Sequence, residues 1–368
     1  MIAYSAEKIF TGHDWLNNHS ILVEDGTIRE IMPTDLLPFD INEVQFEWNM
    51  IVPAFIDLQI YGAGGKLLAM FPEADALTRL QQYCMAGGAH YCLATVATNE
   101  YEVFYKCIDA VKEYWTNGGT GIIGLHIEGP WISVAKRGAH IAALIHSPSM
   151  EQARRLLEYG NGIIKMITLA PEVCSREIVE LIQSYDVVVS AGHTNATFGE
   201  ATGAFDNGIT VATHLYNAMS PLQHRQPGMV GAVLHHRSAM ASIIPDGLHV
   251  DFEAVAIAKR IMHERLFMIT DAVTETNMGP YPHRREGDRF VSEGILSGSA
   301  LTMLKGVQNC VQKIGINLDE ALRMAALYPA TVMGLQNQLG SITRGHKADL
   351  LVLNEQLAIV EQVTAYDS

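Results

Sequence analysis

Between about residues 52 and 335, short apolar runs alternate with longer amphipathic segments. The short runs predict eight β-strands, and the segments between most of them have helical spacing. Strands and helices in alternation are typical of a parallel sheet, and eight such strands make a (β/α)8 barrel of the α/β class. The strands are predicted at 54–60, 91–96, 121–127, 163–169, 187–190, 210–213, 241–244 and 266–270, and the helices at 76–86, 101–115, 150–159, 176–184, 252–263 and 301–314.

Both ends of the chain have a different pattern, with short strands and turns. Residues 20–24 lead into the turn Asp25-Gly26 and then into 27–31, which is a hairpin signature. Near the C-terminus, residues 340–342 and 348–353 have the same β-rich character. We therefore expect the two ends to pair into one small sheet domain.

The composition supports this architecture and narrows the function. With 368 residues, of which 48% are hydrophobic, the chain can bury the core of a barrel plus a small domain. A formal net charge of −15 argues against a nucleic-acid or anionic-membrane partner. The chain has neither a signal-peptide pattern nor an apolar stretch of membrane-spanning length. Its five cysteines contain no C-x-x-C pair, which predicts free thiols in a reducing cytoplasm.

Polar side chains recur where the predicted barrel strands end. A barrel of this kind performs its chemistry at the carboxyl ends of its strands, so these residues are candidates for an active site. They are Gln59 after the first strand, Glu128 after the third, His193 after the fifth, His214 after the sixth, His249 after the seventh and Asp271 after the eighth.

Three of these residues have the chemistry of a metal site. Glu128 ends an apolar strand, where an unpaired carboxylate is costly to desolvate. Together with His193 and His214 it offers one oxygen and two nitrogens, a set that suits a catalytic Zn²⁺ or Fe²⁺. Any one of them alone is more simply explained as a hydrogen-bonded rim residue, but three on one rim favour a metal. Asp271 is placed to take a proton from an attacking water and deliver it to a leaving amine.

The first strand predicts how many metal ions bind. Many two-metal barrel hydrolases have an H-x-H pair at this place, but here Gln59 and Tyr61 occupy it. A second tightly bound ion would lose its usual ligands, so we predict one divalent ion per chain. The ligand set accepts Zn²⁺, Fe²⁺, Co²⁺ or Mn²⁺, and the sequence does not choose among them.

Other residues are candidates for binding a substrate. Arg225, together with backbone N–H groups near Asn217 and Ala218, could bind a phosphate group. His140 and His249 are candidates for polarising a carbonyl or binding sugar hydroxyls. Seven further histidines are expected to be surface or packing residues, namely His13, His19, His235, His236, His263, His283 and His346. Residues 279–288 are expected to form an exposed hairpin or loop.

An ordered series of motifs along nearly the whole chain resembles the N-acetylglucosamine-6-phosphate deacetylase family of the amidohydrolase superfamily. Each motif alone is a modest signal, whereas the series in this order is highly specific. The motifs are Phe55-Ile56-Asp57-Leu58-Gln59, His126-Ile127-Glu128-Gly129-Pro130-Trp131, Gly138-Ala139-His140, Gly192-His193-Thr194-Asn195-Ala196, Thr213-His214-Leu215-Tyr216-Asn217-Ala218-Met219, Asp246-Gly247-Leu248-His249-Val250, Thr270-Asp271-Ala272 and Leu296-Ser297-Gly298-Ser299-Ala300-Leu301-Thr302-Met303.

This resemblance implies a barrel of residues 51–337 and a small β-sandwich domain built from residues 1–50 and 338–368. It also implies hydrolysis of N-acetyl-D-glucosamine 6-phosphate to glucosamine 6-phosphate and acetate, in amino-sugar catabolism in the cytoplasm. It suggests a homodimer, because the family's counterpart of Arg225 is thought to reach the neighbouring subunit's site. The implied roles are metal binding by Glu128, His193 and His214, proton transfer by Asp271, carbonyl polarisation by His140, and substrate binding by Ala139, Asn217, Ala218, Arg225, His249, Leu296, Ser297 and Gly298.

Two other functions stay open at this point. A related barrel amidohydrolase acting on a cyclic amide or another N-acyl substrate would need no phosphate site. A catalytically silent barrel serving as a scaffold would typically have lost a ligand or the base, but this chain retains all four of Glu128, His193, His214 and Asp271. The segment 274–289 does not match the family's flap, which leaves the choice between gluco and galacto substrates open.

Overall fold

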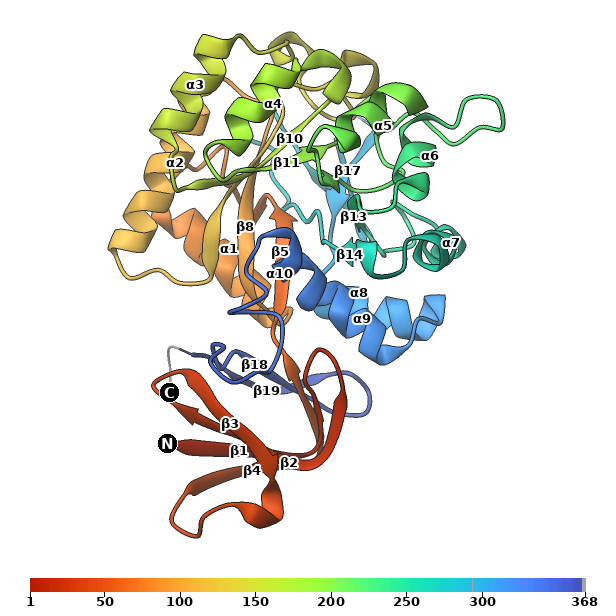
Figure 1. Ribbon diagram of the computed structural model, residues 1–368. Coiled ribbons are helices and arrows are strands. Elements are labelled where there is room, and N and C mark those ends of the chain that lie inside the picture. Colours follow the sequence, from red (N-terminus) through yellow and green to blue (C-terminus); the bar gives the residue numbers. More distant parts are fainter. Residues whose placement is uncertain (293, 366–368) are drawn as a thin grey trace.

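The computed structural model describes residues 1–292 and 294–365. A barrel surrounded by helices forms the larger part, and a smaller sheet lies at one end of it, where the two chain termini meet (Figure 1). Among the described residues, no helix combines the length and apolar character needed to cross a membrane.

Eight parallel strands form the barrel sheet, which confirms the predicted (β/α)8 class. The sheet closes beyond the last strand, where Ile60 pairs with Ala272 and the Asp271 N–H donates to the Gln59 carbonyl at 2.9 Å. The order in the sheet is β14-β13-β12-β11-β10-β9-β8-β5. The strands are β5 (Phe55–Ile60), β8 (Ala89–Ala97), β9 (Ile122–Glu128), β10 (Ile164–Leu169), β11 (Val188–Ala191), β12 (Val211–Ala212), β13 (Met240–Ile243) and β14 (Leu266–Met268).

Helices cover the outside of the barrel, and six lie where the sequence predicts helix. They are α1 (Ala74–Ala86), α2 (Tyr101–Thr116), α3 (Met150–Tyr159), α4 (Arg176–Gln183), α7 (Phe252–Met262) and α8 (Met303–Asn309), which continues into a π-helical turn at Cys310–Ile314. Four further helices were not predicted: α5 (Phe198–Asp206), α6 (Gly228–His235), α9 (Leu318–Ala325) and α10 (Leu327–Val332). In α6 every residue but the last is buried, so it lacks the polar face that marks an amphipathic helix.

The interior of the barrel is apolar apart from a few hydrogen-bonded polar groups. All six residues of β5 are buried, as is usual for a strand covered on both faces. Asp57 accepts hydrogen bonds from the backbone and hydroxyl of Thr270. The His126 ring bonds the Leu58 carbonyl at 3.1 Å and the Thr168 hydroxyl at 2.7 Å. These hydrogen bonds satisfy the buried polar groups. They also link the barrel strands whose carboxyl ends form the candidate site.

The small sheet contains strands from both ends of the chain, as predicted. Its strand order is β19-β18-β4-β1-β2-β3, with β1 (Ile2–Phe10), β2 (Trp15–Glu24), β3 (Thr27–Pro33), β4 (Asn42–Pro53), β18 (Leu350–Leu353) and β19 (Ile359–Val363). The predicted hairpin is β2–β3, and its turn residues Asp25 and Gly26 both have positive φ, 48° and 66°. The domain bounds at 50/51 and 337/338 remain a prediction, and residues 366–368 of the C-terminal segment lie outside the described residues.

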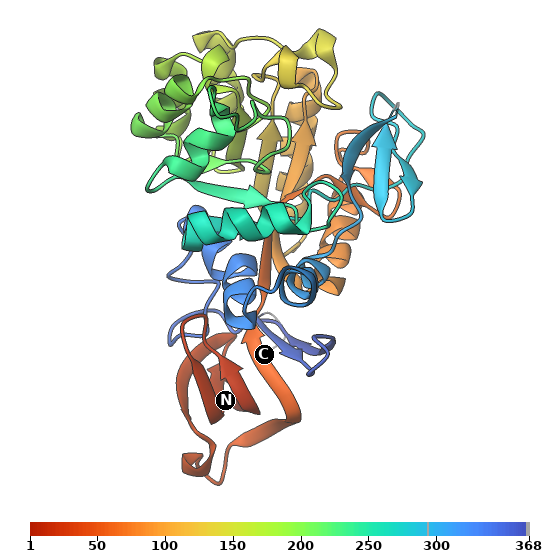
Figure 2. The same cartoon turned by 90° about the vertical axis from the view of Figure 1, so that its right-hand side faces the viewer.

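Two small antiparallel elements lie beside the barrel. One is the short hairpin of β6 (Gly62–Ala63) and β7 (Lys66–Leu67). The other is a three-stranded sheet of β15 (Arg284–Glu286), β16 (Arg289–Ser292) and β17 (Ile295–Ser299), which stands at the side of the barrel in Figure 2. The N–H of Ser299 donates to the Asp271 carbonyl at 2.9 Å. This hydrogen bond joins β17 directly to Asp271, the candidate for proton transfer.

Candidate metal centre and substrate pocket

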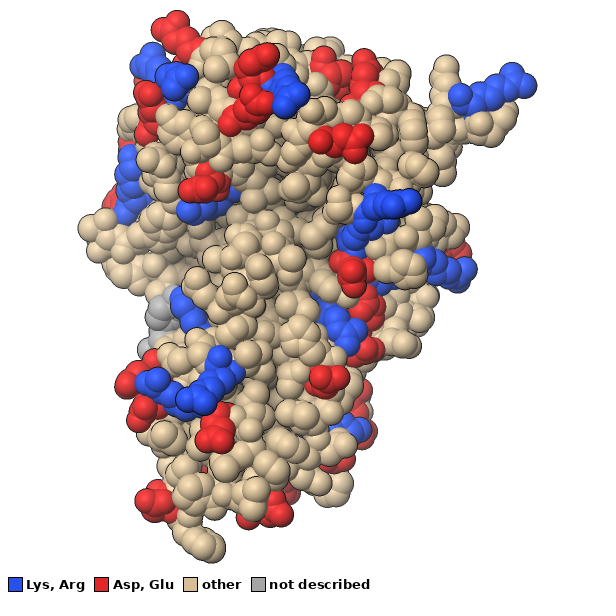
Figure 3. Space-filling view, viewed as in Figure 1, with Lys and Arg blue, Asp and Glu red and all other residues tan. Residues whose placement is uncertain are grey.

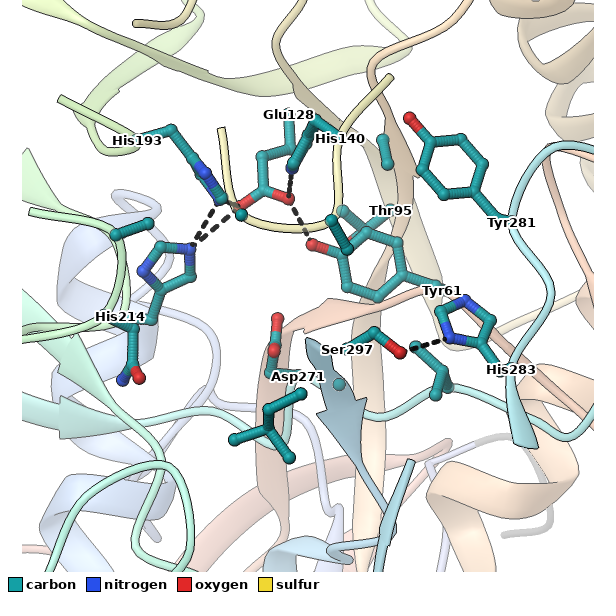
Figure 4. A pocket seen from close by; sticks show the side chains of 18 of the residues that line it. Tyr61, Thr95, Glu128, His140, His193, His214, Asp271, Tyr281, His283 and Ser297 are labelled. Carbon is teal, nitrogen blue, oxygen red and sulfur yellow. Dashed lines mark hydrogen bonds and ion pairs between the residues drawn. The ribbon is translucent and has the colours of Figure 1, made fainter. Parts of the chain in front are cut away.

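A pocket opens at the carboxyl ends of the barrel strands (Figure 4). It brings together residues separated by more than 150 positions in the sequence. Its wall contains the predicted site residues Glu128, Ala139, His140, His193, His214, Asn217, Ala218, His249, Asp271, Leu296, Ser297 and Gly298.

The local backbone turns three of these side chains toward the pocket. His193, His214 and Asp271 each follow the end of a strand, and each has positive φ: 47°, 39° and 54°. A residue other than glycine in this conformation costs about 1–3 kcal/mol, and such residues cluster at functional sites. Three of them on one rim therefore indicate that the site requires this backbone geometry.

Glu128, His193 and His214 meet at one point. The Nε2 atom of His214 lies 3.1 Å from Oε1 of Glu128 and 3.1 Å from Nε2 of His193, and His193 Nε2 lies 3.3 Å from the same oxygen. Nitrogen and oxygen ligands on a tetrahedral Zn²⁺ are roughly 3.3 Å apart, given bonds of about 2.0–2.1 Å. The three atoms thus have the spacing of three corners of a coordination tetrahedron.

The second oxygen of Glu128 faces other residues. Nε2 of His140 lies 3.1 Å from Oε2, and the Tyr61 hydroxyl donates to the same atom. Glu128, His140 and His193 also bring their ligand atoms within 4.8 Å of one another, so His140 is a geometric alternative to His214 as third ligand. Since His140 and His214 contact different oxygens of Glu128, the two sets overlap without being equivalent.

The surroundings of the pocket favour neutral rings at His140 and His214 and a charged carboxylate at Glu128. Burial lowers the pKa of His140 to about 4 and also lowers the pKa of His214, which leaves lone pairs free for a metal. Burial alone would raise the pKa of Glu128, but the neighbouring His193, His140 and His214 outweigh it, and the pKa falls well below its usual range. The Nδ1–H of His193 donates to the Lys136 carbonyl, 2.9 Å away, which orients Nε2 toward the centre.

Gln59 links Glu128, a candidate metal ligand, to Asp271, the candidate for proton transfer. Its amide nitrogen lies 3.0 Å from Oε1 of Glu128 and 2.8 Å from Oδ1 of Asp271. Burial, followed by the charge of Glu128, raises the pKa of Asp271 well above its usual range. A divalent cation beside these two carboxylates would oppose that shift, because it favours both in the charged form.

The substrate-binding candidates form a second part of the wall. Asn217 and Ala218 lie just after His214. The side-chain amide nitrogen of Asn217, Nδ2, is buried and has no hydrogen-bond partner among the described residues. Nδ1 of His249 lies 2.6 Å from the Asp246 carboxylate, which fixes the ring. Leu296 and its two successors enter from β17.

Arg225 does not lie in this pocket. It is exposed on the loop between β12 and α6, which stands out from the molecule at the upper right of Figure 1. Figure 3 shows basic atoms at the end of that loop, and Arg225 is the only Lys or Arg between these two elements. The described pocket wall contains no lysine or arginine of its own.

Three aromatic residues in the wall were not predicted as site residues. The sequence indicates Tyr61 only as half of a lost ligand pair, and none of its motifs contains Tyr281. His283, expected as a surface or packing residue, is buried at 7% exposure and also lines the pocket, which the sequence did not predict. Residues 279–288 do include a hairpin strand, but Tyr281 and His283 turn inward from it. No periodic pattern in this segment distinguishes its inward from its outward residues.

Comparison with known proteins agrees with this geometry. Residues 50–365 match the model of the amidohydrolase family, and residues 1–51 match the NagA composite domain. The N-acetylglucosamine-6-phosphate deacetylase of Haemophilus influenzae is 31% identical, with 96% of each chain covered. The N-acetylgalactosamine-6-phosphate deacetylase of Escherichia coli O157:H7 is 29% identical, over 96% of this chain and 95% of that one. The crystal structure of N-acetylglucosamine-6-phosphate deacetylase from Pasteurella multocida superposes with a TM-score of 0.94 at 32% identity, covering 99% of this chain and 98% of that one.

The chain belongs to the amidohydrolase family, and its own barrel has a polar site at the strand ends. Within it, the resemblance to the N-acetylglucosamine-6-phosphate deacetylase family drawn from the sequence motifs is confirmed along the full length of the chain.

Proposed function

We propose that this protein is a metal-dependent hydrolase that removes acetate from N-acetyl-D-glucosamine 6-phosphate and leaves D-glucosamine 6-phosphate. The observation that carries the proposal is the close triangle of Glu128, His193 and His214 beside Asp271, in a chain that matches deacetylases of this type from end to end. N-acetylgalactosamine 6-phosphate is the alternative substrate, because a relative of similar identity is named for it.

Glu128, His193 and His214 are proposed to hold one divalent ion. Their three ligand atoms lie 3.1–3.3 Å apart, and Nδ1 of His214 is buried without a partner among the described residues, so the ring is held from its Nε2 side. Zn²⁺ is the first candidate, with Fe²⁺, Co²⁺ and Mn²⁺ as alternatives. When bound, such an ion supplies a Lewis acid that polarises an amide carbonyl and acidifies water.

The chain's own residues move the proton. Asp271 accepts a proton from the attacking water through its carboxylate and gives it to the amide nitrogen as the C–N bond breaks. Gln59 holds Oδ1 of Asp271 at 2.8 Å and so fixes the direction in which the carboxylate faces. His140, whose Nδ1 lies 2.7 Å from the Thr98 hydroxyl, is placed to donate a hydrogen bond from Nε2 to the acetyl oxygen.

The remainder of the wall is proposed to bind the sugar phosphate. Asn217, Ala218 and His249 would contact the phosphate, while Ala139 and the segment Leu296, Ser297 and Gly298 would lie along the sugar. Since the described wall contains no lysine or arginine to balance the phosphate charge, we propose that Arg225 of a second copy supplies a positive charge. The protein would then act as a homodimer. A phosphorylated substrate and five free thiols are also consistent with work in the cytoplasm.

Acetate release tests this function. Three substrates are compared, each with and without a chelator: N-acetylglucosamine 6-phosphate, N-acetylgalactosamine 6-phosphate and unphosphorylated N-acetylglucosamine. We expect the first to have the highest kcat/KM, the unphosphorylated sugar to be poor, and the chelator to abolish turnover until metal is returned. No acetate from either phosphorylated sugar would overturn the proposal and favour a different N-acyl substrate.

A further inference from the structure

His283 lies in the pocket wall but has no role in the reaction described above. Its side chain is 7% exposed and reaches the pocket from the segment just before β15. In Figure 4 its ring lies on the same side of the pocket as Ser297, Tyr61 and Tyr281, opposite the side from which His193 and His214 enter.

The backbone around His283 is held in place. Its N–H donates to the Thr276 carbonyl at 2.8 Å, and its own carbonyl accepts from the Thr276 N–H at 3.0 Å. Two residues earlier, the buried Tyr281 donates its hydroxyl hydrogen to the Thr98 carbonyl at 2.5 Å. The segment is thus tied to the second barrel strand's loop, and the position of the ring does not depend on an exposed hairpin tip.

The ring itself has one nitrogen bound and one available. Nδ1 lies 2.9 Å from the Ser297 hydroxyl, while Nε2 has no hydrogen-bond partner among the described residues. Burial lowers the pKa of His283 to about 4, so the imidazole is neutral near pH 7. A neutral imidazole hydrogen-bonds a hydroxyl well and gives no charge to a phosphate.

We propose that His283 is a specificity-determining residue whose Nε2 exchanges a hydrogen bond with one hydroxyl of the substrate's sugar ring, with Ser297 holding the ring in position. This inference rests on the proposed deacetylase function, because it requires an amino sugar in the pocket. A buried hydrogen bond that the substrate leaves unmade costs roughly 10- to 100-fold in kcat/KM, and we expect an effect of this size.

Two substitutions separate this role from a purely structural one. In His283→Gln the side-chain amide reaches the place of Nε2, whereas in His283→Asn it reaches only the place of Nδ1 and can still bond Ser297. Contact with the substrate predicts that Gln retains most of kcat/KM and that Asn loses about 10- to 100-fold. If the ring only supports Ser297, Asn retains activity and Gln does not, and the proposal is overturned.

His346 provides a matched control. It is also 7% exposed, its Nδ1 lies 3.2 Å from the Ser341 hydroxyl, and it belongs to the small sheet's surroundings rather than to the pocket. His346→Ala is expected to lower the melting temperature and leave kcat/KM unchanged. This control variant shows how much of a loss in kcat/KM at position 283 follows simply from removing a buried imidazole that is hydrogen-bonded to a serine.

Analogues of the substrate identify the hydroxyl. N-acetylglucosamine 6-phosphate is compared with analogues lacking the hydroxyl at C1, C3 or C4, in the native protein and in His283→Asn. With the native protein, we expect the kcat/KM of one analogue to be about 10- to 100-fold below that of the parent substrate. With His283→Asn, we expect the same analogue and the parent substrate to have equal kcat/KM. Equal losses in both proteins for all three analogues would overturn the inference while leaving the deacetylase function standing. No turnover of the parent compound by the native protein would instead contradict the function itself.

Discussion

The Nε2 atoms of His193 and His214 lie 3.1 Å apart, with both residues in the left-handed backbone conformation at the ends of neighbouring barrel strands. Only one proton can lie between two ring nitrogens at such a distance, and both nitrogens also lie within 3.3 Å of Oε1 of Glu128. A cation between the three atoms satisfies all of them together. This relationship makes metal binding the most direct consequence of the fold.

Removing one imidazole should therefore remove the metal. We expect about one divalent ion per native chain by elemental analysis, and His214→Ala to weaken its binding by at least about 100-fold, because even changes to residues behind the ligands cost 10- to 100-fold. His140→Ala should weaken binding less, since its Nε2 faces the other oxygen of Glu128. Stronger loss in His140→Ala than in His214→Ala would assign the third ligand to His140.

Asp271→Asn should separate metal binding from proton transfer. The amide is nearly isosteric but cannot accept the proton, so kcat should fall roughly 10²- to 10⁴-fold. Metal content should stay near that of the native protein, since Asp271 is not among the proposed ligands. Turnover close to the native value with metal bound would show that Asp271 is not the proton carrier.

The phosphate contact can be tested at Arg225. We expect Arg225→Ala to raise KM for the phosphorylated sugar by roughly 10- to 100-fold, the cost of one charge-assisted hydrogen bond, with little change for unphosphorylated N-acetylglucosamine. Arg237→Ala, at another exposed arginine, is the control and should change neither value. Because Arg225 is outside its own chain's pocket, mixing this variant with an inactive Asp271→Asn chain should restore activity to some dimers. An unchanged KM in Arg225→Ala would exclude the contact.

The absence of an H-x-H pair at Gln59 and Tyr61 predicts that each chain binds one metal ion. Gln59 and Tyr61 both contact Glu128, and they occupy the place where a second ion would find its ligands. We expect native protein to bind one ion at saturation and the double variant Gln59→His, Tyr61→His to bind more than one. Each single variant, which restores half of the pair, serves as control. Two ions in the native protein would show that these residues do not limit the site to one.

The buried His283 should make stability depend on pH in a defined direction. Its pKa is about 4 when folded against about 6.5 when unfolded, so the unfolded chain binds more protons between these values. Stability from the neutral ring is fully present above about pH 6.5 and falls as the pH drops toward 4, by at most about 3 kcal/mol. Relative to His283→Gln, the native protein should thus lose free energy of unfolding over this range in urea titrations. A difference that does not vary with pH would contradict a buried neutral ring.

The sequence was sufficient for the barrel because its strands are short, apolar and separated by amphipathic helices. The same reasoning missed α6, where nearly every residue is buried and no polar face alternates with an apolar one. It located Glu128, His193, His214 and Asp271 because each stands directly after an apolar strand. His283 has no such signal: it lies in a polar segment, and only long-range bonds to Thr276 and Ser297 bring it inward.

Anomalous diffraction from crystals grown with Zn²⁺ tests the metal site most directly. The expected result is one peak per chain, bonded at about 2.0–2.2 Å to Oε1 of Glu128 and to Nε2 of His193 and His214, with Asp271 alongside. Absence of a peak at this point, or an ion held by other side chains while these three point apart, would contradict the proposed catalytic site.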